Sequence, residues 1–205
     1  MLVKYLSKTR KYKYKDIELE IPPQVFHPGF FSSTHLLLKY VDRFSLEGKT
    51  LLELGAGSGL MAIYAAKKNA MVTASDINPV AIEYLKKNFH RNDTKAEIIH
   101  SDLFENIPPK RFDIIAINPP YYKKEPQSLT DHAWYCGENG EYFSRLFEQL
   151  AGYVHESSVV LMVLCDGCDI AMIKKAAVVN EFNFKLAQTK QYLLEKNFIY
   201  TIEKK

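Results

Sequence analysis

A glycine-rich run near residue 55 and an acidic residue after it are the best candidates in this sequence for binding a ligand. Residues 53–59 read Glu-Leu-Gly-Ala-Gly-Ser-Gly and lie between a short apolar run and a helix-like segment. Glycines at such a turn let a ligand approach the backbone without a Cβ in the way. Asp76 follows Gly55 by 21 residues, at the end of the next apolar run. A carboxylate there can accept hydrogen bonds from ribose hydroxyls, so we expect a nucleoside-containing ligand beyond the strand ends.

Two ligand classes use this arrangement, and the glycine spacing bears on the choice between them. A dinucleotide site requires G-x-G-x-x-G. Counted from Gly55, the last glycine position holds Leu60; counted from Gly57, it holds Ala62, an accepted substitute. The glycine spacing therefore argues against a nicotinamide-dependent oxidoreductase but leaves this hypothesis open. A binding module without catalytic activity also stays open as an alternative.

Residues 53–59 resemble the E-x-G-x-G-x-G signature of class I S-adenosylmethionine-dependent methyltransferases. The resemblance implies that the glycine loop lines the amino-acid half of S-adenosylmethionine and that acids after the next two strands bind its ribose and adenine. Residues 25–38 resemble the segment that closes over the cofactor in the "methyltransferase small domain" group, and we name them the closing segment. The residues implied in cofactor binding are Thr34, Glu53, Gly55, Ala56, Gly57, Gly59, Asp76, Ile77, Asp102, Leu103 and Asn118.

Residues 118–121 indicate which kind of atom is methylated. Asn118-Pro119-Pro120-Tyr121 follows an apolar run and resembles the N-P-P-Y motif of methyltransferases that modify planar nitrogens. Such a nitrogen is a weak nucleophile because its lone pair is delocalised. The side-chain oxygen of Asn118 and the carbonyl of Pro119 can accept its two hydrogens, and they stabilise the positive charge that develops on it. The prolines stiffen the turn, and Tyr121 is expected to stack on the planar target.

Two substrates remain open. A protein glutamine, as in translation release factors, is favoured by Tyr121 and by residues 135–140, which resemble a stretch of release-factor glutamine methyltransferases. A purine amine in ribosomal or transfer RNA is favoured by the basic, tyrosine-bearing segment 4–15, and the closing segment resembles that of rRNA guanine-N2 enzymes. The lysines of that basic segment are equally typical of an exposed edge strand. We expect His132 to help bind substrate and Trp134 to pack under its own loop.

Strands and helices are predicted to alternate from residue 50 onward, which favours a parallel sheet covered by helices on both faces. Strands expected at 184–189 and 198–203 are joined by a short polar turn near Lys196 and Asn197, so they should pair antiparallel. We therefore expect an α/β, three-layer Rossmann-like methyltransferase fold with seven strands, mostly parallel, and an antiparallel last strand. It should form one domain over residues 1–205, with an N-terminal extension (1–49) before a catalytic core (50–205). Within the extension, a hairpin is expected at 13–21 and a helix at 34–44.

Composition excludes several other classes. The chain has 205 residues, of which 47% are hydrophobic and 25% charged, enough apolar material for a core. The N-terminus does not resemble a signal peptide, and no run approaches the roughly 18 apolar residues of a membrane span, so we expect a cytoplasmic protein without membrane contact. Three cysteines argue against a disulfide framework. Cys165 and Cys168 lack matching zinc ligands, so we expect two reduced thiols and no metal.

Overall fold

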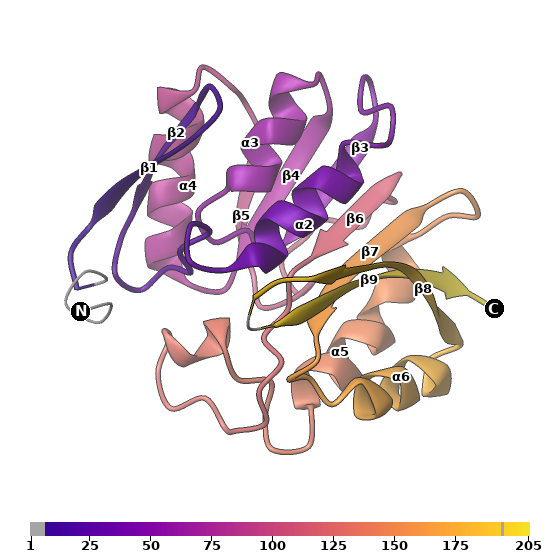
Figure 1. Cartoon of the computed structure of the whole chain (residues 1–205). Coiled ribbons are helices and arrows are strands. Elements are labelled where there is room, and N and C mark those ends of the chain that lie inside the picture. Colours follow the sequence, from indigo (N-terminus) through magenta and orange to yellow (C-terminus); the bar gives the residue numbers. More distant parts are fainter. Residues whose placement is uncertain (1–6, 194) are drawn as a thin grey trace.

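The computed structural model describes residues 7–193 and 195–205, and its centre is a seven-stranded sheet (Figure 1). The strand order is β5-β4-β3-β6-β7-β9-β8. Strands β3 to β7 are parallel to one another, and β9 lies between β7 and β8, antiparallel to both. The predicted α/β architecture is confirmed. The strands are β3 (Thr50–Leu54), β4 (Met71–Asp76), β5 (Glu97–His100), β6 (Ile114–Ile117), β7 (Val159–Cys165), β8 (Phe182–Gln191) and β9 (Lys196–Lys204).

Helices cover both faces of the sheet, as Figure 1 shows. On one face lie α2 (Ser32–Val41), α3 (Leu60–Lys67) and α4 (Pro79–Arg91), and on the other lie α5 (Glu141–Leu150) and α6 (Ile170–Val179). Successive strand side chains point to opposite faces. In β3, Leu51 belongs to the apolar cluster on the face covered by α2, α3 and α4. Leu52 and Leu54 belong to the cluster on the face covered by α5 and α6. Two-sided burial explains why the central strands are almost continuously apolar.

The N-terminal hairpin is longer than predicted and is attached to α4. It pairs β1 (Arg10–Tyr14) with β2 (Ile17–Ile21). The Asn88 side chain accepts from the backbone NH of Glu20 at 2.8 Å and donates to its carbonyl at 3.1 Å. Tyr12 packs against the apolar cluster, and its hydroxyl lies 2.8 Å from Nε2 of His35, so this ring is used in packing. Lys4 and Tyr5 of the basic segment lie outside the described residues.

The turn predicted near Lys196 and Asn197 is wrong. Both residues belong to β9, which begins at Lys196, and β8 ends at Gln191. Asn197 is fully buried, and its Nδ2 donates to Ser32 Oγ at 3.2 Å and to Glu195 at 2.8 Å. A polar residue that is typical of turns is thus held inside a strand by tertiary hydrogen bonds. Within residues 7–193 and 195–205, none of the helices is long and apolar enough to cross a membrane.

Candidate active site

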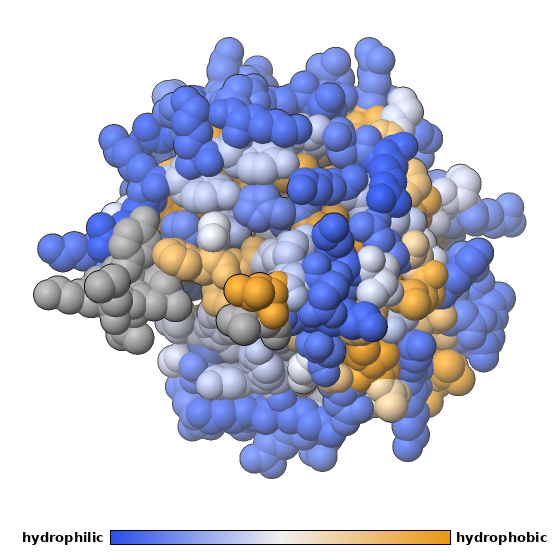
Figure 2. Space-filling model, in the orientation of Figure 1, coloured by the Kyte–Doolittle hydropathy of each residue, from blue (hydrophilic) through white to orange (hydrophobic). Residues whose placement is uncertain are grey.

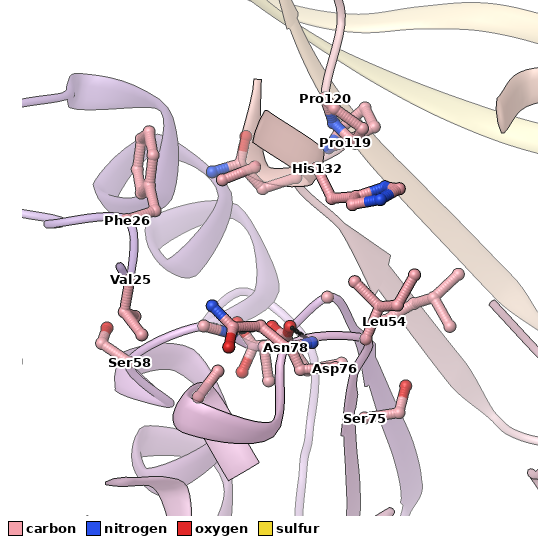
Figure 3. A pocket seen from close by; sticks show the side chains of 18 of the residues that line it. Val25, Phe26, Leu54, Ser58, Ser75, Asp76, Asn78, Pro119, Pro120 and His132 are labelled. Atoms are coloured by element: carbon pink, nitrogen blue, oxygen red, sulfur yellow. Dashed lines mark hydrogen bonds between the residues drawn. The ribbon is translucent and has the colours of Figure 1, made fainter. Parts of the chain in front are cut away.

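A cavity lies at the carboxyl ends of β3, β4 and β6, where the strand order changes direction between β3 and β6. In open α/β sheets this switch point is where ligands bind. In Figure 3, Asp76 and Asn78 lie on one side of the cavity, and Pro119, Pro120 and His132 lie across from them. The predicted site residues that line it are Thr34, Glu53, Gly55, Ala56, Gly57, Asp76, Ile77, Asp102, Leu103, Asn118, Pro119, Pro120 and Tyr121.

The glycine loop leaves room for a ligand at its first glycine. Gly55 has φ +73°, and a Cβ built there would meet no atom within 4 Å. At Gly57 (φ +53°) a Cβ would come within 3.7 Å of Val25 Cγ1 in the closing segment. The loop is held to β4, because Ala56 donates to the Ser75 carbonyl and Gly57 donates to Asp76 Oδ2, both at 2.8 Å. The positive φ values and the open space both explain the glycines.

Gly59 is not among the residues that line the cavity, and its contact with a cofactor stays a prediction. It is the N-cap of α3, with φ +80°. A Cβ built there would lie 2.6 Å from Leu85 Cδ2 of α4. The positive φ and the close approach of α4 both favour glycine at this position.

Two carboxyl groups, of buried Glu53 and half-buried Asp76, line the floor of the cavity. Burial, and to a lesser extent the charge of Asp76, raise the pKa of Glu53 to about 8, even though its Oε2 accepts from the Ala62 NH. Burial also raises the pKa of Asp76, whose two oxygens accept from Gly57 and from Asn78, each at 2.8 Å. Each oxygen retains a lone pair for a ligand. The pair therefore suits a ligand with hydroxyl and cationic groups.

Asp102 lines the cavity but is also part of an ion pair that the sequence did not indicate. Its Oδ2 accepts from Arg145 Nη2 at 2.7 Å, and the same guanidinium nitrogen lies 2.8 Å from Glu105. Leu103 beside it is 6% exposed and has φ +48°, an unusual conformation for a branched side chain. The Arg145 pair leaves the second oxygen of Asp102 available to a ligand.

Asn118 lines the cavity directly after β6, and its side-chain nitrogen is directed at α2. Nδ2 of Asn118 lies 3.3 Å from Ser33 Oγ and 3.3 Å from Thr34 Oγ1. For Oδ1, no hydrogen-bond donor is found in the described part of the chain. The predicted site residue Thr34 is therefore next to Asn118 as well as in the cavity wall.

Tyr121 is largely enclosed. Its ring packs edge-on against Tyr122, with ring centroids 4.9 Å apart, and burial raises the pKa of its hydroxyl, so the phenol stays neutral. Behind it lie Cys165 and Cys168, both free thiols, with sulfur atoms 3.6 Å apart. The expected stacking of Tyr121 on a target stays a prediction.

The cavity mouth is formed by the closing segment and the loop before α5. Trp134 does not pack only within its own loop as predicted, because its ring contacts Phe26 and Phe31, with centroids 5.3 and 5.1 Å away. The carbonyl of Trp134 accepts from the backbone of Tyr121 at 3.2 Å, which holds this loop on the N-P-P-Y turn. His132 lines the cavity, as Figure 3 shows.

Sequence reasoning missed two residues. Ser33 is 4% exposed and contacts Asn118, but a serine in the first helical turn carries no signal of that contact. Tyr142 of α5 lines the cavity, and burial raises the pKa of its hydroxyl. Its position two residues after Gly140 in an amphipathic helix indicated burial but not a cavity.

The known proteins that this chain resembles are methyltransferases. Residues 18–134 match the methyltransferase small domain family. A Methanocaldococcus jannaschii protein, provisionally named a protein N5-glutamine methyltransferase, is 35% identical over 150 residues, which cover 70% of this chain and 74% of that protein. Ribosomal RNA small subunit methyltransferase C of Haemophilus influenzae is 33% identical over 129 residues, 56% of this chain and 38% of that protein. The chain therefore matches well under half the length of the second relative.

Solved structures share the fold at lower identity. The 16S rRNA N2 methyltransferase of T. thermophilus, solved in complex with AdoMet and guanosine, superposes with a TM-score of 0.68 at 21% identity, covering 97% of this chain and 50% of that one. A second solved structure is the E. cuniculi Mtq2–Trm112 complex, which is responsible for methylation of the translation termination factor eRF1. It superposes with a TM-score of 0.68 at 19% identity, covering 89% of this chain and 99% of that one. At these identities the likeness is one of fold.

Proposed function

Because this chain belongs to the methyltransferase small domain family and is an S-adenosylmethionine-dependent methyltransferase, we propose that it methylates a planar nitrogen, namely the side-chain amide of a protein glutamine. The family assignment argues against the two alternatives from the sequence, a nicotinamide-dependent oxidoreductase and a binding module without catalytic activity. The observation that carries the proposal is the position of Asn118, which lines the same cavity as the glycine loop. Its Nδ2 is directed at Ser33 and Thr34, and its Oδ1 has no donor in the described part of the chain.

The cavity fits S-adenosylmethionine. The open space at Gly55 accommodates a ligand against the loop backbone. A cationic sulfonium or ammonium group would favour the ionised form of the Glu53 carboxyl, whose pKa burial raises to about 8. We assign ribose binding to Asp76, packing against adenine to Ile77 and Leu103, and the adenine amino group to the oxygen of Asp102 that Arg145 leaves available. The bound cofactor supplies an electrophilic methyl group.

The residues across the cavity bind and orient the target. Asn118 Oδ1 and the Pro119 carbonyl accept the two hydrogens of a planar NH2 group, so its plane and direction are fixed before transfer. The same oxygens stabilise the positive charge that develops on nitrogen as the N–C bond forms and the S–C bond breaks. Tyr121 and Trp134 supply flat apolar surfaces against which a planar group packs.

A protein substrate is supported by the surface around the mouth. Figure 2 shows hydrophobic atoms between the loop before α2 and the tip of the β8–β9 hairpin on a mainly hydrophilic face. Two large apolar side chains of these segments are exposed: Phe30, in the loop before α2, is 43% exposed, and Leu193, shortly after β8, is 96% exposed. Protein surfaces that bind nucleic acid are typically polar and positively charged, whereas these exposed side chains are apolar. The 35% identity to a protein named as a glutamine methyltransferase supports the same substrate.

A purine amine in ribosomal or transfer RNA is the second candidate, because the 33% identical relative is named as an rRNA methyltransferase. The exposed lysines of β1, such as Lys11 and Lys13, provide positive charge for phosphates.

The two candidates are separated by incubating the protein with tritiated S-adenosylmethionine and either purified release factor or unmodified 16S rRNA. We expect label in the release factor and, by mass spectrometry of its peptides, a 14-dalton increment on one glutamine. Label in RNA alone would overturn the glutamine proposal and leave the planar-nitrogen chemistry standing. Label in neither would remove both.

A further inference from the structure

The hydroxyl of Ser33 is placed to control which atom of the Asn118 amide faces the cavity. Ser33 is buried in the first turn of α2, and its Oγ lies 3.3 Å from Nδ2 of Asn118. Thr34 Oγ1 lies at the same distance from the same nitrogen. Nδ2 carries two hydrogens, so two hydroxyl oxygens can accept both. Ser33 itself does not line the cavity, whereas Thr34 and Asn118 do.

The direction of this amide matters because its oxygen accepts hydrogen bonds, whereas its nitrogen donates them. A carboxamide rotated by half a turn about its last side-chain bond has nearly the same shape but exchanges oxygen for nitrogen. With Oδ1 toward the cavity, Asn118 accepts a hydrogen from the target. With Nδ2 there, it would donate to the nitrogen lone pair that must attack the methyl group. In the structure Nδ2 is directed at the two hydroxyls, which leaves Oδ1 as the end of the amide that a target in the cavity can meet.

We propose that Ser33 is a positioning residue that, with Thr34, holds the Asn118 amide so that its oxygen meets the target nitrogen. The inference rests on the proposed transfer to an NH2 nitrogen, but it is the same for glutamine and for a purine amine. Ser33 acts only through Asn118, because it is buried behind the cavity wall.

The kinetic test compares three variants. Ser33→Ala removes one acceptor, and Ser33→Thr retains the hydroxyl. Ser158→Ala is the matched control, because Ser158 Oγ donates to the Phe112 carbonyl at 2.7 Å and this residue does not line the cavity. For Ser33→Ala we expect kcat to fall about five- to tenfold, which lies within the roughly two- to twelvefold range of one neutral hydrogen bond. The dissociation constant for S-adenosylhomocysteine should stay within about twofold of wild type. Ser33→Thr should recover most of kcat, and Ser158→Ala should leave it unchanged.

The proposal is overturned if Ser33→Ala turns over like wild type, if Ser158→Ala loses as much, or if the loss follows weaker cofactor binding. Single-turnover rates in an Asn118→Ala background give a second check, since Ser33→Ala should have no further effect there. An equal further loss would mean that Ser33 acts independently of Asn118.

A spectroscopic readout separates this inference from the choice of substrate. In the wild-type protein with S-adenosylhomocysteine, the side-chain NH2 signals of Asn118, assigned by their absence in Asn118→Ala, should show nuclear Overhauser contacts to the Ser33 β-protons and the Thr34 methyl group. Ser33→Ala should weaken these contacts or average them. Their absence in the wild type would mean the reversed amide and would overturn the inference even if glutamine methylation is confirmed. Their presence would support it even if neither substrate is methylated.

Discussion

Replacing Glu53 by Gln should stabilise the protein at alkaline pH while it weakens the binding site. The pKa of Glu53 is about 8 in the folded protein, mainly because burial disfavours the charged carboxylate. In the unfolded chain it returns to about 4.3. Between these values the folded state holds the extra proton, so this residue makes the free energy of unfolding fall as pH rises. At about 1.4 kcal/mol per pKa unit, the loss reaches roughly 4–5 kcal/mol above pH 8.

The assay is urea unfolding of the ligand-free protein at several pH values between 5 and 9. Gln retains an oxygen for the Ala62 NH but stays neutral throughout. The difference in free energy of unfolding between Glu53→Gln and wild type should therefore increase in favour of the variant by several kcal/mol from pH 5 to pH 9, at an unchanged m-value. Glu47→Gln is the matched control, because the same charge is removed from an exposed side chain, and its difference should stay nearly flat.

A difference for Glu53→Gln that does not change with pH, or that grows in favour of the wild type, would refute this reasoning. Binding supplies the second half of the prediction. A cationic ligand favours ionised Glu53, so wild-type affinity for S-adenosylhomocysteine should rise as pH increases toward 8. The variant should bind more weakly at pH 8 and lose this dependence, as calorimetry at each pH would reveal.

Three further substitutions test the other parts of the site. Asn118→Ala should retain cofactor affinity but lower turnover on the order of a hundredfold, as measured by single-turnover methyl transfer; full activity would contradict its role. Asp76→Ala should weaken S-adenosylhomocysteine binding by roughly 1–3 kcal/mol in calorimetry, because it removes charged acceptors for the ligand and for Gly57; unchanged affinity would contradict the ribose assignment. Gly55→Ala should abolish detectable binding, whereas Gly48→Ala, with nearly the same φ (+71° against +73°) and equally open surroundings but outside the cavity, should lose similar stability and still bind. If both glycine variants bind equally, the loop does not contact the ligand.

Much of the fold and cavity was accessible from the sequence for a simple geometric reason. Parallel strands end at the same edge of a sheet, so polar or glycine residues that follow successive apolar runs meet there. Asp76 and Asn118 lie far apart in the chain, yet both line one cavity as predicted. The periodicity of apolar residues also indicated the two-sided sheet, because burial on both faces requires it.

A local signal failed where a long-range contact overrides it. Asn197 is typical of a turn, but it lies inside β9, where its side chain bonds Ser32 of α2 as well as the neighbouring Glu195. The contact with Ser32 could not be identified without the packing of distant segments. The close approach of Leu85 to Gly59 is likewise a contact between two helices that the glycine signature does not indicate.

The sequence by itself determined the order of strands and helices, the glycine turn and the residue types at the strand ends, because these depend on local spacing and apolar period. Only the tertiary structure decided how those residues act. It buries Glu53 deeply enough to raise its pKa, and it brings Ser33 of α2 against Asn118, 85 residues further along the chain. Burial and hydrogen-bond direction arise from the packing of segments that are remote in sequence, and no local pattern encodes them.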